Sequence, residues 1–455
     1  MKYKGNVTDL GFNKAPSTTM HIDFNSCFAT IEQQANPLLR GKPIAVAAYT
    51  TPSGCIVAPS VEAKKLGIKV GMRVKDGKAI CPELVVLEPD PWKYRDVHLK
   101  LRKLISRYTS DFAPRSIDEF VLNMEGYLHL HKSNTAKMLN SNGQGLPLSK
   151  YVMHSVAKEI KQKIKSEIGE WLTVSVGIAP NRFLAKTAAG LNKPDGLDEI
   201  NCKNFRSIYS NLKLTDLCGI KFKNTARLNS VGIYTVNDFY DAPLWKIKAA
   251  FQSINGYYWY VRLHGWEIDD IEFGRRSYGN SYALPKPLKT PQELSPILTK
   301  LVEKMGFRLR RAGLKAKGIH LSVMYRDWSY WHKAVTFEKE LFDSREIYKK
   351  VFTILCRSSL KKPVRELAVS VFDLRDSDSV QLELFEDVVK KEKLVNSIDK
   401  TNERWGNYMI TPARMLYADK TVVPDRIAFG GVKELEEFTL DNTNIQMNTN
   451  DTNVY

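Results

Sequence analysis

Two adjacent carboxylates inside an apolar segment constrain the fold of this chain more than any other sequence feature. Asp118 and Glu119 lie in the segment 114–121, PRSIDEFV. Neighbouring side chains of a regular strand point to opposite faces, so both acids can serve one site only where the backbone turns or bulges. We therefore expect them at the tip of a β-hairpin. A surface turn with two solvated acids is the simpler interpretation of such a pair taken alone.

A third acid, Asp23, favours a functional interpretation. It lies near the end of the segment 18–24, TTMHIDF, which has the pattern of a short strand. Three carboxylates from two strands can hold a pair of hard divalent cations through oxygen, as phosphoryl transfer requires. The sequence therefore predicts a candidate metal site at Asp23, Asp118 and Glu119.

Charge indicates the class of partner. The net charge is +18, although the last 80 residues contain fifteen acids and nine bases. A basic body with an acidic tail favours a polyanionic partner such as nucleic acid, while a merely basic soluble protein would show the same charge. Six scattered cysteines without a Cys-x-x-Cys pair disfavour a zinc site and a disulfide framework.

Hydropathy excludes the membrane classes. No segment approaches the roughly 20 apolar residues of a membrane span, and the N-terminus lacks the apolar core of a signal peptide. We expect a cytoplasmic protein without a membrane partner. Residues 1–16 are polar and aperiodic, which predicts a loose extension, and 127–150 read as an irregular insertion.

Potential phosphate-binding groups flank the acids. Phe28 begins a predicted helix, with Asn25 or Ser26 as its cap, and the amides at a helix start can hold an anion. Phe28 by itself has the pattern of a core aromatic. Lys64 and Lys186 lie on two further predicted helices, where a lysine is either a phosphate ligand or simply solvated. The order strand, helix, acidic hairpin, helix, strand predicts an α+β layer close to a ferredoxin-like plan.

Two basic modules follow. Residues 211–240 contain helix–glycine-turn–helix patterns at Gly219 and Gly232, which suit either amide contacts to phosphate or ordinary helix ends. Residues 277–373 read as β-α-β-β-α-β, with strands and helices expected at 277–284, 291–313, 318–326, 331–338, 342–359 and 366–373. We expect salt-dependent phosphate contacts from the clustered bases of this module. They are Arg275, Arg276, Lys286, Lys289, Arg308, Arg310, Arg311, Lys315 and Lys317. Solvated helix ends are the alternative.

The acidic tail contains an apolar peptide. Gln381, Leu382, Leu384 and Phe385 form the pattern Gln-Leu-x-Leu-Phe, which could anchor the chain in a partner's pocket. Residues 436–455, rich in Asn and Thr, are expected to be disordered.

Together these features resemble the Y-family translesion DNA polymerases. The match extends from about Met20 to Leu374 and is most specific at Ser116–Phe120, SIDEF. Similarity is closest to the branch of the bacterial DNA polymerase V catalytic subunit and the ultraviolet-resistance proteins of Gram-positive bacteria. A motif at residues 425–431 is common in this branch, and we have no mechanism for it.

The resemblance implies a role for each site residue. Asp23, Asp118 and Glu119, with the main-chain carbonyl of Phe24, would hold two Mg²⁺ ions, Asp118 bridging both and Glu119 nearer the primer end. Phe28 matches the aromatic that excludes a ribose 2′-hydroxyl. Lys64 and Lys186 match residues that contact the triphosphate. Val61 and Lys64 replace the usual Tyr and Arg, so a hydroxyl contact is lost and a bidentate guanidinium becomes a point charge.

The resemblance also implies a right-hand domain order. The expected parts are an N-terminal extension (1–16), a palm (17–27 and 89–193), fingers (28–88), a helix-hairpin-helix thumb (194–263), a linker (264–274), a little finger (275–374) and an acidic tail (375–455). Residues 381–385 would bind the replicative sliding clamp.

The expected function is low-fidelity DNA synthesis past damaged template bases. Its substrates would be primer–template DNA and deoxynucleoside triphosphates, with accessory subunits possible. A non-catalytic DNA-binding scaffold and a nucleotide cyclase are the alternatives from other classes. The first is disfavoured by the complete set of acids and lysines, and the second by two modules suited to a duplex.

Overall fold

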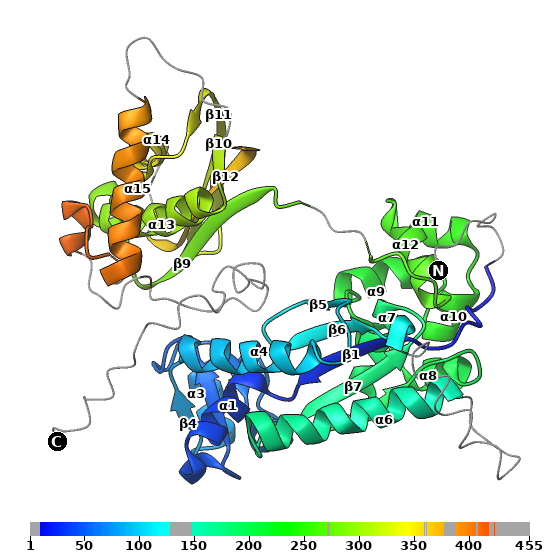
Figure 1. The fold of residues 1–455 in the computed structure, drawn as a ribbon. Coiled ribbons are helices and arrows are strands. Elements are labelled where there is room, and N and C mark those ends of the chain that lie inside the picture. The colour runs from blue at the N-terminus through cyan, green and yellow to red at the C-terminus, as the bar shows by residue number, and fades with distance from the viewer. Residues whose placement is uncertain are drawn as a thin grey trace, which may run out of the picture. The chain divides into compact units, whose positions relative to one another are not determined.

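The chain divides into two compact units in a computed structural model. The structure describes residues 10–127, 148–270, 274–358, 360, 362–376, 388–405, 408–417 and 423. Unit 1 spans Met1–Ile271 together with Arg426–Tyr455, and unit 2 spans Glu272–Asp425 (Figure 1). Within the described residues, no helix is both long enough and apolar enough to cross a membrane.

Unit 1 is built on a five-stranded sheet of order β5-β6-β1-β7-β8 (Figure 1). Its strands are β1 (Thr19–Phe24), β5 (Phe112–Pro114), β6 (Glu119–Asn123), β7 (Val174–Ala179) and β8 (Leu197–Glu199). Buried Met20, Ile22 and Phe24 alternate along β1 and pack into the main core with α4 and α6. The alternate residues of β1, His21 and Asp23, point to the other face of the sheet. The expected α+β layer is confirmed.

The helices around this sheet are α1 (Cys27–Ala35), α4 (Pro91–Ile105), α6 (Leu148–Lys163), which continues as a π-turn at Ile164–Ile168, and α7 (Arg182–Leu191). The expected cap of α1 is only partly correct. Ser26 occupies the N-cap position, but its φ is 54° and its side chain makes no capping hydrogen bond.

A smaller three-stranded sheet of order β3-β2-β4 lies between α1 and α4 in sequence. It comprises β2 (Ile44–Ala47), β3 (Ile56–Pro59) and β4 (Val85–Leu87), with α2 (Val61–Lys65), α3 (Val74–Ile80) and the short turn Pro37–Leu39. Part of it has its own small apolar cluster. Phe28 and Ile31 of α1 belong instead to the main core, so the boundary expected at residue 28 falls inside a helix of that core.

The rest of unit 1 is helical. Its elements are α8 (Phe205–Asn211), the turn Leu214–Asp216, α9 (Phe222–Asn229), α10 (Val236–Asp241), α11 (Leu244–Phe251) and α12 (Asn255–Leu263). Gly219 and Gly232 have φ of 91° and 72°. These left-handed values are ones that a side chain disfavours, and they confirm the two glycine turns.

The expectation of a loose N-terminal extension is wrong for residues 10–16, the part that the structure describes. Leu10 and Phe12 are buried, and the Phe12 ring stacks on Phe205 with centroids 4.1 Å apart. The main-chain amide of Asn13 donates to His264 O at 2.8 Å. The segment is polar as a whole, but Leu10 and Phe12 pack into the apolar core of the helical part of unit 1.

Unit 2 has the expected β-α-β-β-α-β order. Its elements are β9 (Ser277–Leu288), α13 (Pro291–Arg311), β10 (Leu314–Tyr325), β11 (Tyr330–Leu341), α14 (Ser344–Cys356) and β12 (Val364–Asp376), with an antiparallel sheet of order β11-β10-β12-β9. Alternation of buried and exposed residues along β10 and β12 fits a sheet covered on one face.

A further helix, α15 (Val388–Trp405), and the turn Ala413–Tyr417 belong to unit 2, although the sequence assigned them to an acidic tail. Two ion pairs attach α15 to α13 and β10. Arg310 of α13 donates twice to Asp399, at 2.6 and 2.8 Å, and Lys315 of β10 lies 2.7 Å from Glu392. The basic side chains are 9% and 6% exposed. The clamp-type peptide, the 425–431 motif, residues 436–455 and most of the 127–150 insertion lie outside the described residues.

Replacement of Asp399 by Ala should destabilise unit 2. It leaves the nearly buried Arg310 charge without its partner, which costs about 3 kcal/mol. Hydrogen exchange of the full-length protein should show faster exchange in α13 and α15. Asp327→Ala, which breaks an exposed pair with Lys362, is the control and should change little. Equal protection in both variants would contradict a structural role for α15.

Candidate active site

The acidic hairpin and β1 bring the predicted carboxylates together. β5 and β6 form the hairpin, Asp118 lies in its turn and Glu119 begins β6. Asp23 is the register partner of Glu119, and the Phe24 amide donates to Asp118 O at 3.0 Å. The two neighbouring acids thus lie at the turn of a β-hairpin, as the sequence predicted.

The hairpin turn is held from beneath by α4. His98 is buried, and its Nδ1–H donates to the Ile117 carbonyl at 2.8 Å. Its ring stacks on Phe120 with centroids 4.8 Å apart. Burial lowers the pKa of His98, so a neutral imidazole fixes the residue that precedes Asp118.

The three acids are not equivalent. His21, Asp23 and Glu119 each offer one ligand atom, and these atoms all lie within 4.8 Å of one another. The Asp118 carboxylate lies outside this group and instead accepts a hydrogen bond from Ser116 Oγ at 2.5 Å. The structure therefore brings Asp23 and Glu119 together directly, with Asp118 beside them.

Two lysines neutralise the paired carboxylates. Lys186 Nζ donates to both oxygens of Glu119, at 2.8 and 2.6 Å. Lys193 Nζ lies 2.6 Å from Asp23 Oδ1. Each carboxylate thus has a cation within hydrogen-bond distance.

Burial and neighbouring charges shift the pKa values of the site residues. Burial raises the pKa of Asp23 to about 6, against the effect of Lys193, and it also raises the pKa of Asp118. Burial acts in the same direction on Glu119, but the hydrogen bonds from Lys186 and the nearby positive charges outweigh it and lower that pKa. Burial lowers the pKa of His21 to about 3, so this histidine is neutral.

The donor set fits a hard divalent cation. Carboxylate oxygens from Asp23, Glu119 and the adjacent Asp118 are the ligands that Mg²⁺ prefers. Buried carboxylates without compensating charge are unfavourable, and here the Lys186 and Lys193 ammonium groups supply positive charge that a cation would also supply.

The other predicted nucleotide residues lie in distinct settings. Phe28 is 1% exposed, and its ring stacks on Tyr94 with centroids 4.1 Å apart. Lys64 lies on α2, where burial lowers its pKa and the charges of Asp23 and Asp118 oppose that shift. The Lys64 ammonium therefore interacts with the charges of the acidic site. The Phe28 side chain is packed in the core.

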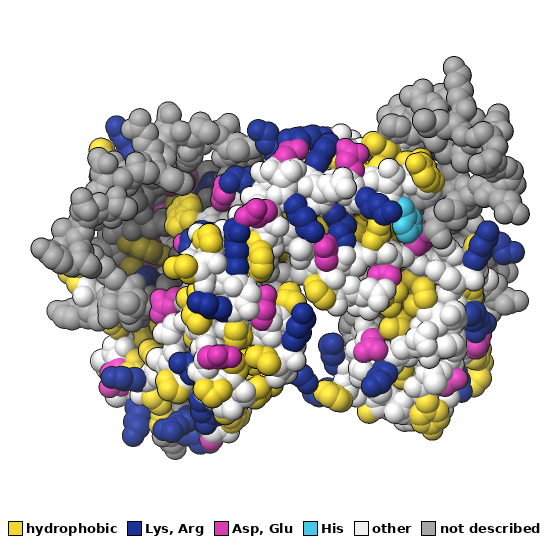
Figure 2. All heavy atoms as spheres, turned by 90° about the horizontal axis from the view of Figure 1, so that it is seen from below, with side chains coloured by type: hydrophobic (Ala, Val, Ile, Leu, Met, Phe, Trp, Pro, Cys, Tyr) yellow, Lys and Arg dark blue, Asp and Glu magenta, His cyan; other side chains and the backbone are white. Residues whose placement is uncertain are grey.

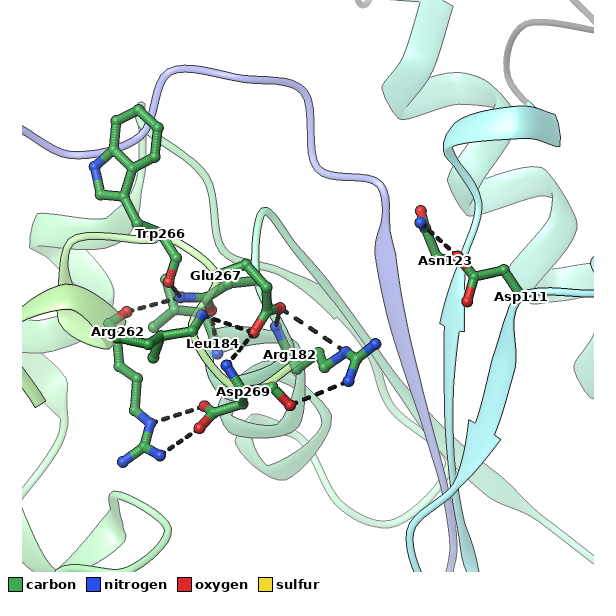
Figure 3. Close-up of polar contacts among 10 residues, drawn as sticks. Asp111, Asn123, Arg182, Leu184, Arg262, Trp266, Glu267 and Asp269 are labelled. Carbon is green, nitrogen blue, oxygen red and sulfur yellow. Dashed lines mark hydrogen bonds and ion pairs between the residues drawn. The ribbon is translucent and has the colours of Figure 1, made fainter. Parts of the chain in front are cut away.

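A polar network fixes the helix that carries Lys186 (Figure 3). Asn181 Oδ1 caps α7 by accepting from Leu184 N at 2.8 Å. Its Nδ2 donates to the Arg262 and Trp266 carbonyls, both at 2.9 Å. Because these carbonyls lie at the end of α12 and just beyond it, α7 is locked to the helical part of unit 1.

Glu267 adds a second attachment to the start of α7. Its Oε2 accepts from Arg182 N at 2.9 Å, and Arg182 Nη1 donates to Asp269 O at 3.1 Å (Figure 3). The predicted linker 264–274 therefore begins as an ordered segment on α7.

The basic residues predicted for unit 2 differ in their surroundings. Arg275, Arg276 and Arg311 are exposed. Arg308 donates to Gly279 O at 2.7 Å. Arg310 is nearly buried and forms an ion pair with Asp399. Its charge is therefore neutralised inside unit 2 and is not accessible to DNA.

Sequence reasoning missed His21, Ser116 and Lys193. His21 carried a signal, since it stands two residues before Asp23 and so shares its face of β1. Lys193 lies in the turn after α7, and no sequence pattern places that turn beside β1.

Comparisons with known proteins agree with this geometry. Residues 22–190 match the impB/mucB/samB family, and residues 275–384 match the C-terminal domain of the same family. The chain is 29% identical over 410 residues to DNA polymerase IV 1 of Bacillus subtilis, covering 88% of this chain and 94% of that protein. It is 30% identical over 404 residues to DNA polymerase IV of Oceanobacillus iheyensis, covering 86% and 90%.

A solved Y-family DNA polymerase chimera shares the fold. Its TM-score is 0.66 at 23% identity, covering 79% of this chain and 99% of that one. The relatives named here are called DNA polymerase IV, and the closer likeness to the polymerase V branch stays a prediction. The chain belongs to the impB/mucB/samB family, and its resemblance to the Y-family translesion DNA polymerases is thereby confirmed.

Proposed function

We propose that this protein is a DNA-directed DNA polymerase that extends primers past damaged template bases with low fidelity. The observation that carries the proposal is the cluster of Asp23, Glu119 and adjacent Asp118, compensated by Lys186 and Lys193. The family membership and the DNA polymerase IV relatives support it.

Asp23, Asp118 and Glu119 are proposed to hold two Mg²⁺ ions, with the Phe24 carbonyl as a further ligand. Mg²⁺ bound there would lower the pKa of the primer 3′-hydroxyl and neutralise charge on the triphosphate. In this arrangement Lys186 and Lys64 contact the triphosphate. The Lys186–Glu119 ion pair would open when a metal ion binds Glu119 and the triphosphate binds Lys186.

Phe28 is the proposed gate against ribonucleotides. Its ring stacks on the Tyr94 ring of α4, and a fixed ring excludes a ribose hydroxyl better than a mobile one. Loose enclosure of the nascent base pair follows from the small size of the β2-β3-β4 sheet, and a loosely enclosed pair admits damaged bases at the expense of discrimination.

The duplex is proposed to contact both units. Amides at the Gly219 and Gly232 turns suit sequence-independent phosphate contacts, and Arg275, Arg276, Arg308 and Arg311 suit salt-dependent ones. Figure 2 shows lysine and arginine side chains scattered among acidic and apolar ones. Arg310 is left out of this set because Asp399 neutralises it.

Residues 381–385 are proposed to bind the sliding clamp. This proposal rests on the sequence alone. A non-catalytic scaffold would not need the clustered carboxylates, and a nucleotide cyclase would not need the two basic modules.

Replacement of Asp118 and Glu119 together by Ala should abolish primer extension in Mg²⁺ and deoxynucleotides. Loss of the metal ligands removes charge stabilisation worth several kcal/mol, or a rate decrease of at least about 10³-fold. Asp111→Ala removes an exposed acid at the base of the same hairpin, where it bonds Asn123 (Figure 3), and should leave extension intact. Unchanged extension in the double variant would refute the mechanism.

Phe28→Leu should increase ribonucleotide incorporation while deoxynucleotide incorporation is retained. Leu is chosen because truncation of this buried ring to Ala costs about 3–5 kcal/mol of stability. Single-nucleotide insertion with matched ribo- and deoxyribonucleotides measures the ratio. Phe112→Leu, on the edge strand β5, is the control. Equally strict exclusion of ribonucleotides by the Phe28 variant would remove the gate assignment.

Mg²⁺ affinity should fall as the pH is lowered through about 6. The pKa of Asp23 in the metal-free fold is about 6, above its ordinary 3.8, and only the ionised form binds metal. Below pH 6 affinity should drop by up to about tenfold per pH unit for this proton. By the same linkage, the metal-free protein loses stability as the pH rises from about 4 through 6. Calorimetric Mg²⁺ titration at pH 5.5 and 7.5 is the test, and equal affinities would contradict it.

A further inference from the structure

His21 is a buried residue for which the fold provides no hydrogen bond. Its side chain is 1% exposed, and within the part of the chain that the structure describes neither ring nitrogen has a hydrogen-bond partner. A buried polar group left unpaired has lost its hydrogen bonds with water without replacement. Such a position favours an apolar side chain unless another state of the protein supplies a partner.

Strand geometry aims this imidazole at the carboxylates. His21 and Asp23 are two residues apart on β1 and share a face, and Asp23 pairs in register with Glu119. His21 Nε2 lies 3.9 Å from Glu119 Oε2. This distance is too long for a hydrogen bond, but a rotation of the Glu119 side chain can close it.

The other side of the site is closed by α7. His21 is the register partner of Gly177 on β7. A Cβ at Gly177 would lie 2.0 Å from Ala185 O and 2.2 Å from Ala189 N, so the main chain of α7 packs directly on the sheet here. The same helix carries Lys186 to Glu119.

Lys186 explains why His21 and Glu119 do not bond in this state. Its Nζ occupies both Glu119 oxygens. A divalent cation bound to Asp23 and Glu119 repels the lysine ammonium and competes for the same oxygens. A neutral imidazole is not repelled in this way and still carries an N–H.

We propose that His21 is a positioning residue of the metal centre, whose Nε2–H donates to the Glu119 carboxylate when a divalent cation displaces Lys186. Hydrogen bonds of this kind orient ligating carboxylates, and their loss typically lowers metal affinity about 10–100-fold. The inference rests on the proposed metal site and adds to it a residue outside the three carboxylates.

Mn²⁺ titration of the full-length protein, followed by the EPR signal of the free ion, tests this role. His21→Leu removes the N–H and keeps an apolar volume. It should weaken Mn²⁺ binding about tenfold or more, while Tm in EDTA stays unchanged or rises because the unpaired group is gone. His21→Gln places an amide donor near the Nε2 position and should restore most of the affinity.

His264→Leu is the matched control. His264 is also buried, but its Nδ1–H donates to Tyr260 O at 2.6 Å, so its loss should lower Tm and leave Mn²⁺ affinity unchanged. Equal Mn²⁺ affinity in wild type and His21→Leu would overturn the inference alone. So would a lowered Tm or failure to fold in His21→Leu, or a directly coordinated ¹⁴N signal that this variant abolishes. Absence of Mn²⁺ binding by the wild type would overturn the metal site, and this inference with it.

Discussion

The arrangement of unit 1 depends on charge compensation at a set of partly buried carboxylates. Asp23, Asp118 and Glu119 are largely removed from water, where ionised groups are stable only with opposite charge nearby. Lys186 and Lys193 supply it at 2.6 Å from Glu119 and Asp23. In the proposed function, a divalent cation would take over this positive charge at the carboxylates when substrate binds.

Close packing of α7 on the sheet positions Lys186 beside Glu119. Gly177 on β7 lets the main chain of α7 approach the sheet, since a Cβ there would clash with Ala185 O. Asn181 and Glu267 fix the start of the same helix. Lys186 is therefore directed by a helix that is tied to the sheet on one side and to the end of α12 on the other. On the opposite wall, His98 holds the hairpin turn through Ile117.

Local pattern predicted most of the fold and part of the site. Local pattern placed the elements of the β-α-β-β-α-β unit within a few residues, and glycines marked the two turns of the helical part of unit 1. The hairpin followed from two neighbouring acids that had to share a site. Partners brought together by tertiary packing were not predictable. Lys193 pairs with Asp23 from a turn that no sequence pattern places beside β1. Arg310 was predicted to contact DNA, but it pairs with Asp399 of α15. Phe12 lies in a polar segment, and its burial depends on the Phe205 ring, which is distant in sequence.

The exchange of lysine for metal at the carboxylates is the central claim, and diffraction tests it most directly. Crystals of the protein with a dideoxy-terminated primer–template, a matched deoxynucleoside triphosphate and Mn²⁺ should give anomalous peaks at Asp23, Asp118 and Glu119. Lys186 should be displaced from Glu119 toward the triphosphate, with the Asp118 carboxylate turned away from Ser116. A bound triphosphate with no anomalous peak at the carboxylates, and with both lysine pairs intact, would contradict the account.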